Sequence, residues 1–286
     1  MHSTLLILAA GASSRMKASK GNENLSEEEI KNANSISKAL IGLGKDNRPL
    51  LDYLLINTEK AGYTSVILIV GEQADSFKQC YGKAMKNNKY KGLNISYATQ
   101  YIPADRIKPF GTADAVYQAL EQYPSLKNES FTVCNCDNLY SVEALAALRS
   151  TKAKNALISY NREGLLFSME RIARFALMCF DPKNYLIDII EKPAPQKTSD
   201  YKDTKGAFRV SMNVFKFNGT QFYPYLKSCP VHPDRNEKEL PTALLNMCKD
   251  DPKAILGIAM NEHVPDLTSK EDIAIMKDYI KRYFGE

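Results

Sequence analysis

Short apolar segments alternate with amphipathic segments through the first half of the chain. The apolar segments predict strands over residues 4–10, 66–70, 94–98, 131–135 and 155–160. Apolar residues at helical spacing predict helices between them, over residues 50–61, 113–123 and 142–150. Ser141 is a suitable N-cap for the last of these helices. Strands that alternate with helices form a mostly parallel sheet with helices on both faces, so we expect an α/β fold.

The second half of the chain has a different pattern. Strands are predicted over residues 176–180, 186–190 and 210–217, with turns between them, which indicates an antiparallel extension beside the parallel core. A helix over residues 240–247, a strand over 255–260 and a terminal helix over 270–283 follow. The segments 192–206 and 228–239 are long loops, a length typical of binding segments. No linker separates two domains, so we expect a single domain over residues 1–286.

Residues 18–37 form a polar stretch in which Leu25, Ile30 and Ile36 are the only large apolar side chains. We expect this stretch to be mobile when no ligand is bound. One short helix is predicted inside it, over residues 26–32, with Ser26 as its N-cap and Glu29 at the third helical position.

Composition and charge exclude several classes of protein. The chain has 286 residues, of which 44% are hydrophobic and 25% charged, and its longest apolar run is too short for a transmembrane helix. The net charge of +5 is mild and the two signs are interspersed, so no nucleic-acid partner is indicated. Six cysteines without CxxC spacing fit a reducing, cytoplasmic compartment. A zinc site at Cys134 and Cys136 would need further Cys or His ligands nearby in space, and the chain has only three histidines, so we expect both cysteines in the core.

Two segments carry candidate chemistry. Gly11 and its small neighbours leave backbone N–H groups accessible to a ligand directly after the first strand. Arg15 adds a guanidinium group whose paired N–H donors fit a polyphosphate. Asp137 follows the strand over residues 131–135, at the carboxyl edge where open α/β sheets bind ligands. Mg²⁺ prefers one or two carboxylates together with phosphate oxygens, so Asp137 and Asp266 are candidate ligands. The alternative for Asp266 is that its segment simply starts the terminal helix.

These segments, with others in order along the chain, resemble the nucleotidyltransferase superfamily, in the group that contains sugar-phosphate nucleotidylyltransferases. The matching segments are residues 8–16, 37–40, 108–116, 134–138, 191–193, 211–214, 239–242 and 263–268, and Gln100 also matches. Each motif is weak alone, and the signal lies in their joint order. The resemblance implies a Rossmann-like three-layer α/β/α fold with a mixed, mostly parallel central sheet and a smaller antiparallel extension on the sugar side. It also implies a nucleotide-binding half over residues 1–150, a sugar-phosphate half over 151–268 and a C-terminal helix over 269–286.

The resemblance assigns a role to each matching residue. The catalytic residues it implies are Arg15, Lys38, Asp137 and Lys192. The nucleotide-binding residues are Ala10, Gly11, Ala12, Gln100, Gly111 and Thr112. The sugar-phosphate residues are Glu191, Lys192, Asn213 and Glu239, and the Mg²⁺ ligands are Asp137 and Asp266. Arg15 and Lys38 are further apart than is typical of the family, which suggests a flexible lid over residues 18–37.

The expected reaction joins a nucleoside triphosphate to a sugar 1-phosphate and releases pyrophosphate. Two alternatives stay open: a cytidylyltransferase acting on a non-sugar phosphorylated acceptor, and a nucleotide-sugar-binding regulator without catalysis. The nucleobase and the sugar are not fixed by the sequence. The terminal helix carries an apolar stripe that can dock on the body of the molecule or on a second copy, which leaves a homo-oligomer open. The stripe consists of Ile273, Met276, Ile280 and Tyr283.

Overall fold

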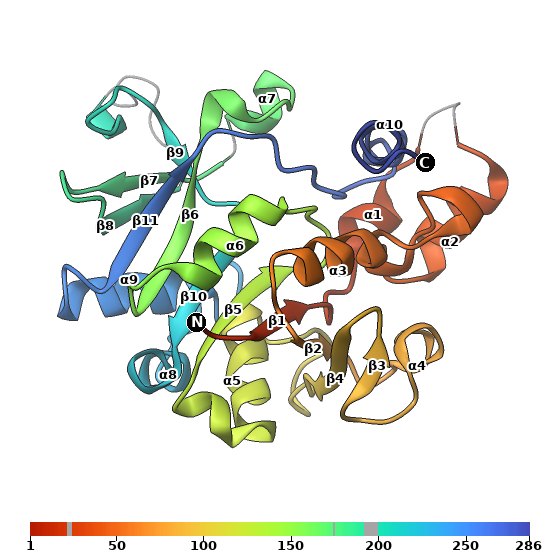
Figure 1. Ribbon diagram of the computed structural model, residues 1–286, viewed down its shortest axis with the longest axis horizontal. Helices are drawn as coiled ribbons and strands as arrows, with labels where there is room; N and C mark the ends of the chain where they lie inside the picture. Colours follow the sequence, from red (N-terminus) through yellow and green to blue (C-terminus); the bar gives the residue numbers. More distant parts are fainter. Residues whose placement is uncertain (22–24, 174, 192–199) are drawn as a thin grey trace.

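A large mixed β-sheet forms the centre of the protein (Figure 1). The computed structural model describes residues 1–21, 25–173, 175–191 and 200–286. The strands of the sheet, in order across it, are β3 (Asn88–Tyr90), β4 (Leu93–Thr99), β2 (Ser65–Val70), β1 (Thr4–Leu8), β5 (Ser130–Asn135), β10 (Val214–Asn218), β6 (Asn155–Asn161), β9 (Arg209–Val210), β7 (Leu177–Phe180) and β8 (Leu186–Ile190). An additional strand, β11 (Ile255–Met260), pairs with β6.

The core of the sheet is parallel and one end of it is antiparallel. Strand β1 lies between β2 and β5 and is parallel to both, and β2 is parallel to β4. Strand β10 runs antiparallel between β5 and β6, and β9, β7 and β8 form the antiparallel end. The predicted fold class is therefore confirmed. Parallel pairing brings the carboxyl ends of β1, β2, β4 and β5 to one edge of the sheet, which is where the cavity described below opens.

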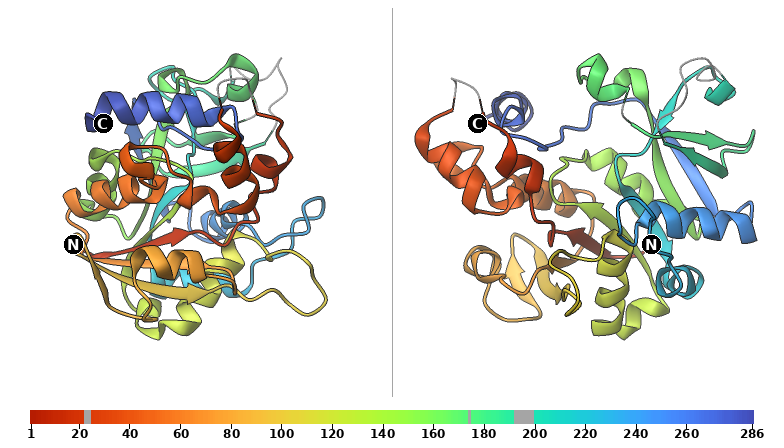
Figure 2. Two further views of the ribbon diagram at one scale, coloured as in Figure 1. Left: turned by 90° about the vertical axis from the view of Figure 1, so that its right-hand side faces the viewer. Right: turned by 180° about the vertical axis from the view of Figure 1, so that it is seen from behind.

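Helices cover both faces of the sheet (Figures 1 and 2). Side chains alternate between the faces along β1: Leu5 and Ile7 belong to one core, and Leu6 belongs to the other. The first core includes α3 (Leu50–Lys60), α6 (Val142–Ser150) and α10 (Asp272–Phe284). The second includes α5 (Thr112–Gln122), α8 (Gly219–Lys227) and α9 (Leu240–Asp250). This gives the three-layer arrangement expected from the alternating pattern.

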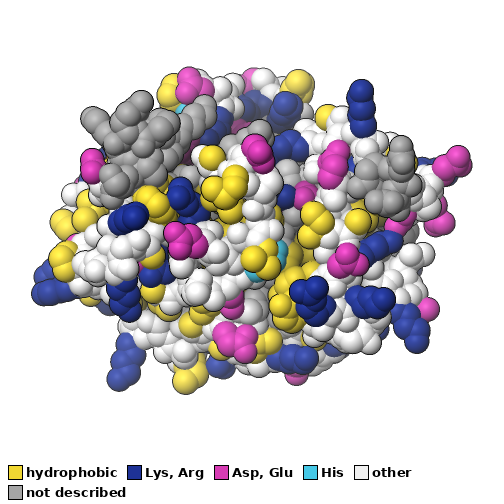
Figure 3. Space-filling model, turned by 90° about the horizontal axis from the view of Figure 1, so that it is seen from above, with side chains coloured by type: hydrophobic (Ala, Val, Ile, Leu, Met, Phe, Trp, Pro, Cys, Tyr) yellow, Lys and Arg dark blue, Asp and Glu magenta, His cyan; other side chains and the backbone are white. Residues whose placement is uncertain are grey.

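Shorter helices and 3₁₀ turns lie in the connections between these elements. The remaining helices are α1 (Ser14–Ala18), α2 (Glu27–Ser35), α4 (Asp75–Tyr81) and α7 (Met169–Ile172). Single 3₁₀ turns lie at Lys38–Leu40, Lys45–Asn47, Pro124–Lys127 and Arg162–Gly164. None of the helices in the described part of the chain is long and apolar enough to cross a membrane. On the face seen from above, Lys and Arg side chains are interspersed with Asp and Glu side chains (Figure 3).

The helix predicted inside the polar stretch is confirmed as α2. The amide of Glu29 donates to Ser26 Oγ over 3.2 Å, and the amide of Ser26 donates to Glu29 Oε2 over 2.7 Å, which is a complete capping box. Ala33 is fully buried, and Glu29 also forms an ion pair with Lys277 of α10. Helix α2 therefore has tertiary contacts of its own, while the expected mobility of residues 18–37 stays a prediction.

One prediction about the second half needs correction, and another is confirmed in large part. The strand predicted over residues 210–217 is broken into β9 and β10, because Asn213 adopts the left-handed conformation with φ of 56°. The apolar stripe of the terminal helix docks on the body of the molecule, which is one of the two expected alternatives, through three of its four residues. Ile273, Met276 and Ile280 are buried against the body, whereas Tyr283 is 62% exposed and stacks on Tyr279.

Candidate active site

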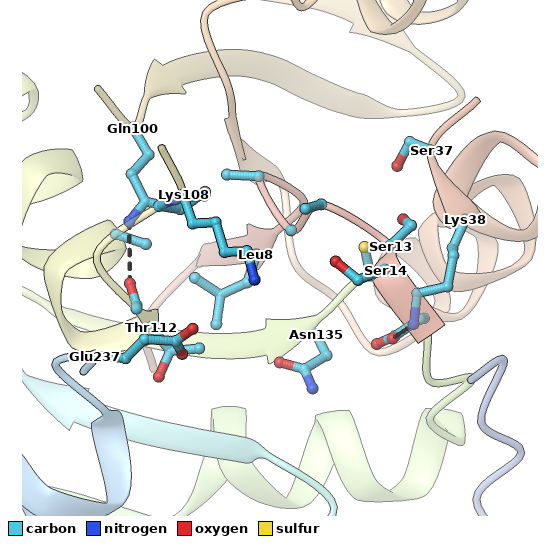
Figure 4. Close-up of a pocket in the computed structure, with 18 of the residues that line it drawn as sticks. Leu8, Ser13, Ser14, Ser37, Lys38, Gln100, Lys108, Thr112, Asn135 and Glu237 are labelled. Atoms are coloured by element: carbon cyan, nitrogen blue, oxygen red, sulfur yellow. Dashed lines mark hydrogen bonds and ion pairs between the residues drawn. The ribbon is translucent and has the colours of Figure 1, made fainter. Parts of the chain in front are cut away.

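A cavity of about 410 Å³ opens at the carboxyl edge of the parallel strands (Figure 4). Its walls come from the segment after β1, the 3₁₀ turn at Lys38–Leu40, the end of β5 and the loop before α5. The predicted site residues that line it are Ala10, Gly11, Ala12, Arg15, Lys38, Gln100, Gly111, Thr112 and Asp137. Segments more than one hundred residues apart in sequence thus meet at one cavity, as the strand-edge argument requires.

The segment after β1 presents backbone donors to this cavity. Within the described residues, the amide N–H groups of Gly11, Ala12, Ser13 and Ser14 have no hydrogen-bond partner. Ser13 is left-handed, with φ of 54°, and turns the chain into α1. Successive unpaired amides around such a turn form a concave anion site. Arg15, the second residue of α1, lines the same wall and adds a cation to it.

Lys38 and Asp137 form an ion pair on the cavity wall. Lys38 Nζ lies 2.5 Å from Asp137 Oδ2, and the two side chains are only 11% and 18% exposed. Asp137 lies just past β5, where the amide of Cys136 still donates to the carbonyl of Leu8 on β1. The end of the sheet therefore fixes the Asp137 backbone, and the ion pair fixes its side chain.

Cys134 and Cys136 belong to the core below this pair. Both thiols are buried, and burial raises the pKa of each well above its usual range. A thiol in this state is protonated at neutral pH and is a poor metal ligand.

Gln100 and Gly111 build the opposite wall. Gln100 is 3% exposed, and its Nε2 donates to the carbonyl of Gly111 over 3.0 Å and to Asp114 Oδ2 over 2.9 Å. Gly111 has φ of 104°, and a Cβ there would lie 2.3 Å from the carbonyl oxygen of Lys238. Only glycine fits this turn without strain. Thr112 Oγ1 accepts a hydrogen bond from the amide of Leu240, so its hydroxyl also holds a neighbouring loop in place.

The long loop 228–239 forms part of the site. It projects beside the loop before α5 (Figure 2, left), where the amide of Lys238 donates to the carbonyl of Phe110 over 2.7 Å. The Arg106 guanidinium lies 4.0 Å from the centre of the Phe110 ring in its own loop, and its Nη2 donates to the carbonyl of Asn236 in the 228–239 loop. Glu237 of this loop lines the cavity, and sequence reasoning did not select it; Lys108, which opens the matching segment 108–116 but was assigned no role, lines the cavity as well. The length of this loop predicted a binding segment from the sequence, but length alone does not indicate which residue lines the site.

Asp266 lies next to Asp137 but faces a second cavity. The amide of Leu267 donates to the carbonyl of Asp137 over 2.8 Å, which pairs the two acidic segments through their backbones. Burial and the negative charge of Asp137 raise the pKa of Asp266. Its Oδ2 accepts hydrogen bonds from Arg171 Nη2 and Thr268 Oγ1, over 2.7 and 2.6 Å. The carboxylate lines a smaller cavity of about 190 Å³ between α7 and α10.

Three of the predicted sugar-phosphate residues, Glu191, Asn213 and Glu239, lie outside the lining of the main cavity. The register of Val214 with Cys134 places Asn213 beside the carboxyl end of β5. Glu191 and Glu239 are joined by Arg235, whose Nη2 and Nη1 lie 2.6 and 2.7 Å from their carboxylates. Lys192 lies outside the described residues. The roles of these four residues stay predictions.

Comparison with known proteins identifies the family. Residues 33–256 match the family model described as nucleotidyl transferase. The chain is also similar to a solved structure of UDP-glucose pyrophosphorylase complexed with UDP-glucose, with a TM-score of 0.69 and 14% sequence identity over 99% of each chain. At that identity the structural similarity shows a shared fold. The family match covers most of the chain, so this protein belongs to the nucleotidyl transferase family and is a nucleotidyltransferase.

Proposed function

We propose that the protein transfers a nucleotidyl group from a nucleoside triphosphate to a sugar 1-phosphate and releases pyrophosphate. The observation that carries this proposal is the convergence of Arg15, Lys38 and Asp137 on one cavity with four unpaired amides. Such a wall suits a polyanion and a metal-bound phosphate. The structural similarity to a pyrophosphorylase that was solved with a nucleotide sugar adds support for a sugar acceptor.

The reaction needs alignment and charge neutralisation more than a protein nucleophile. An oxygen of the acceptor phosphate attacks the α-phosphorus, the new P–O bond forms, and the bond from the α-phosphorus to the bridging oxygen breaks to release pyrophosphate. We assign the β- and γ-phosphates to the amides of residues 11–14 and to Arg15. Lys38 offsets the charge that builds at the α-phosphate. Gln100 and Gly111 shape the wall that receives the nucleobase.

Asp137, which lines the main cavity, would hold a divalent cation, and Asp266, which lines the second cavity beside it, would be a further ligand. Burial and the negative charge of Asp137 raise the pKa of Asp266, although Arg171 pairs with its carboxylate, so two neighbouring ionised carboxylates repel each other here. Within the described residues, no group of three or more His, Cys, Asp and Glu side chains is placed to hold a metal alone. This donor set suits Mg²⁺, which takes one or two carboxylates and completes its shell with phosphate oxygens and water. When bound, Mg²⁺ would withdraw negative charge from the phosphates.

The sugar side of the proposal depends on four further residues. Lys192 would bind the acceptor phosphate, while Glu191, Asn213 and Glu239 would contact sugar hydroxyls. Arg235 holds Glu191 and Glu239 together across the opening between two loops. All six cysteines are free, which supports a cytoplasmic enzyme.

The test is a panel of turnover measurements. The protein is incubated with each common triphosphate, Mg²⁺ and a series of sugar 1-phosphates or non-sugar phosphates, and pyrophosphate release is measured. Turnover with at least one sugar 1-phosphate supports the proposal. Turnover only with CTP and a non-sugar acceptor favours a cytidylyltransferase of that kind, and no turnover with any pair favours a nucleotide-sugar-binding regulator.

Matched variants locate the activity in the cavity. Arg15→Ala should lower kcat/KM for the triphosphate at least 30-fold, because it removes a cation from the wall. Lys17→Ala is the control, since Lys17 lies on the same helix, is exposed and does not line the cavity. Equal effects of the two substitutions would contradict the assignment.

A further inference from the structure

Lys270 is a buried cation that holds the end of a short helix. Lys270 is only 2% exposed. Its ammonium donates to the carbonyl of Met16 over 2.9 Å and to that of Lys17 over 3.2 Å. It also donates to the carbonyl of Ser19. A buried lysine with this set of partners is fully satisfied by backbone oxygens, because an ammonium has three donors.

A second connection joins the end of α1 to the segment that contains Lys270. The backbone amide of Lys270 donates to Ser19 Oγ over 3.0 Å, and Ser19 Oγ donates to the carbonyl of Met16 over 2.9 Å. Gly21 lies against the Lys270 stem, where a Cβ would come within 3.4 Å of Lys270 Cδ. The contact is therefore built from a side chain, two backbone segments and a small residue that leaves room for them.

Helix α1 needs such an anchor. It has five residues, and isolated helices of that length are unstable in water. Met16 is its only buried residue. A cation among the last carbonyls of a helix satisfies orphan acceptors and interacts favourably with the helix dipole. The position of α1 thus depends on the Met16 side chain and on Lys270.

The anchored helix carries part of the proposed triphosphate site. Ser14 and Arg15, the first two residues of α1, line the main cavity, and the unpaired amides of residues 11–14 lead directly into it. On the other side, Lys270 lies four residues after Asp266, in a segment whose backbone pairs with Asp137 through Leu267. Lys270 therefore connects α1, which carries Arg15, to the segment whose backbone pairs with Asp137.

We propose that Lys270 is a positioning residue for Arg15 and for the amide loop that precedes it. It contacts neither the cavity nor a reacting atom, and it acts by fixing α1 relative to the segment that holds Asp266. This inference rests on the proposed function, because that function assigns Arg15 and the loop to the triphosphate. It predicts that loss of Lys270 weakens triphosphate binding and leaves acceptor binding intact.

The first experiment compares Lys270→Met with Lys281→Met, which alters an exposed lysine on α10. Lys270→Met should raise KM for the triphosphate about tenfold and leave KM for the acceptor within twofold, while Lys281→Met changes neither. Equal increases in both KM values, or no increase, would overturn the proposal.

A double-mutant cycle then tests whether Lys270 acts through Arg15. In the Arg15→Ala background, Lys270→Met should raise the triphosphate KM by less than threefold. A full tenfold increase in that background would show that the two residues act independently, and would overturn the assignment. A general loss of stability would not produce this dependence on Arg15.

A measurement without turnover separates this inference from the proposed function. The amides of Lys17 and Ser19 donate to the carbonyls of Ser13 and Arg15, so hydrogen exchange reports on α1. Lys270→Met should speed their exchange at least tenfold and leave the amides of α3 unchanged. Unchanged exchange at Lys17 and Ser19 would refute the anchor even in an active enzyme, whereas absence of turnover in the wild-type protein would refute the function alone.

Ser19→Ala serves if Lys270→Met does not fold. It removes one hydroxyl from the same contact and should raise the triphosphate KM two- to threefold, with faster exchange at the Lys17 amide. No change in either quantity would contradict the proposal.

Discussion

The substitution Asp137→Asn distinguishes the contribution of the Lys38–Asp137 ion pair to folding stability from its contribution to catalysis. In Asp137→Asn, Lys38 loses its only charged partner among the described residues, while both side chains stay largely enclosed. A hydrogen bond between charged groups contributes about 1.5–3 kcal/mol, and breaking a fully buried pair costs about 3–5 kcal/mol. The cavity is open to water at this wall, so we expect a loss of about 2 kcal/mol in the free energy of unfolding.

The effect on activity should be larger than the effect on stability. If Asp137 holds the metal that binds the phosphates, its removal should lower kcat about 1,000-fold, which corresponds to about 4 kcal/mol of activation free energy. The double variant Lys38→Met/Asp137→Asn removes the unpaired lysine charge. It should regain about half of the lost stability and none of the activity.

Two assays decide the outcome. Urea denaturation gives the free energy of unfolding, and pyrophosphate release gives kcat, with Asp278→Asn on the exposed side of α10 as the control. The reasoning is refuted if Asp137→Asn keeps kcat within tenfold of the wild-type value. It is also refuted if the double variant is active, because Lys38 and Asp137 would then be structural only.

Three further predictions concern the loops, a helix cap and a buried histidine. Gly111→Ala should destabilise the protein by about 2–3 kcal/mol in urea and raise the triphosphate KM, because φ of 104° and the Lys238 carbonyl leave no room for a Cβ; wild-type behaviour would contradict this. Ser26→Ala should cost α2 about 1 kcal/mol, seen as faster hydrogen exchange confined to that helix. Burial, with the charges of Lys216 and Arg149, lowers the pKa of His2 to about 4, so its stabilising effect is present above pH 6.5 and is lost as the pH falls toward 4. Between pH 7 and 4.5 the wild-type protein should therefore lose about 2 kcal/mol more than His2→Gln does, and equal losses would argue against a neutral His2.

Most of the fold could be predicted because its signals are local. The strands β2 and β11 are almost continuous apolar runs, and α6 begins at a serine whose Oγ accepts the amide of Ala144, as the N-cap pattern predicts. The break between β9 and β10 was missed because residues 210–217 alternate largely between apolar and polar side chains through Asn213, and the left-handed conformation of a single asparagine leaves no periodic signal. Helix α8 was missed because Pro224 lies inside it, and proline normally argues against a helix.

Among the site residues, too, some could be predicted from local sequence patterns and others could not. Arg15 and Asp137 follow predicted strands, so the strand-edge rule placed them together without knowledge of the tertiary structure. Lys270 and Arg171 could not be found by that rule, because each acts on a segment about 95 to 250 residues away. The ion pair of Lys38 with Asp137 likewise joins residues 99 positions apart, and no local pattern specifies such a contact.

The fate of the α-phosphorus tests the central claim most directly. The protein is given a triphosphate labelled at the α-phosphorus, Mg²⁺ and a sugar 1-phosphate, and the labelled products are separated. Nucleotidyl transfer predicts that the label enters a nucleotide sugar only when the sugar 1-phosphate is present, in amounts equal to the pyrophosphate released. Label that appears instead in free nucleoside monophosphate, or that stays in the triphosphate with every acceptor, would contradict the account.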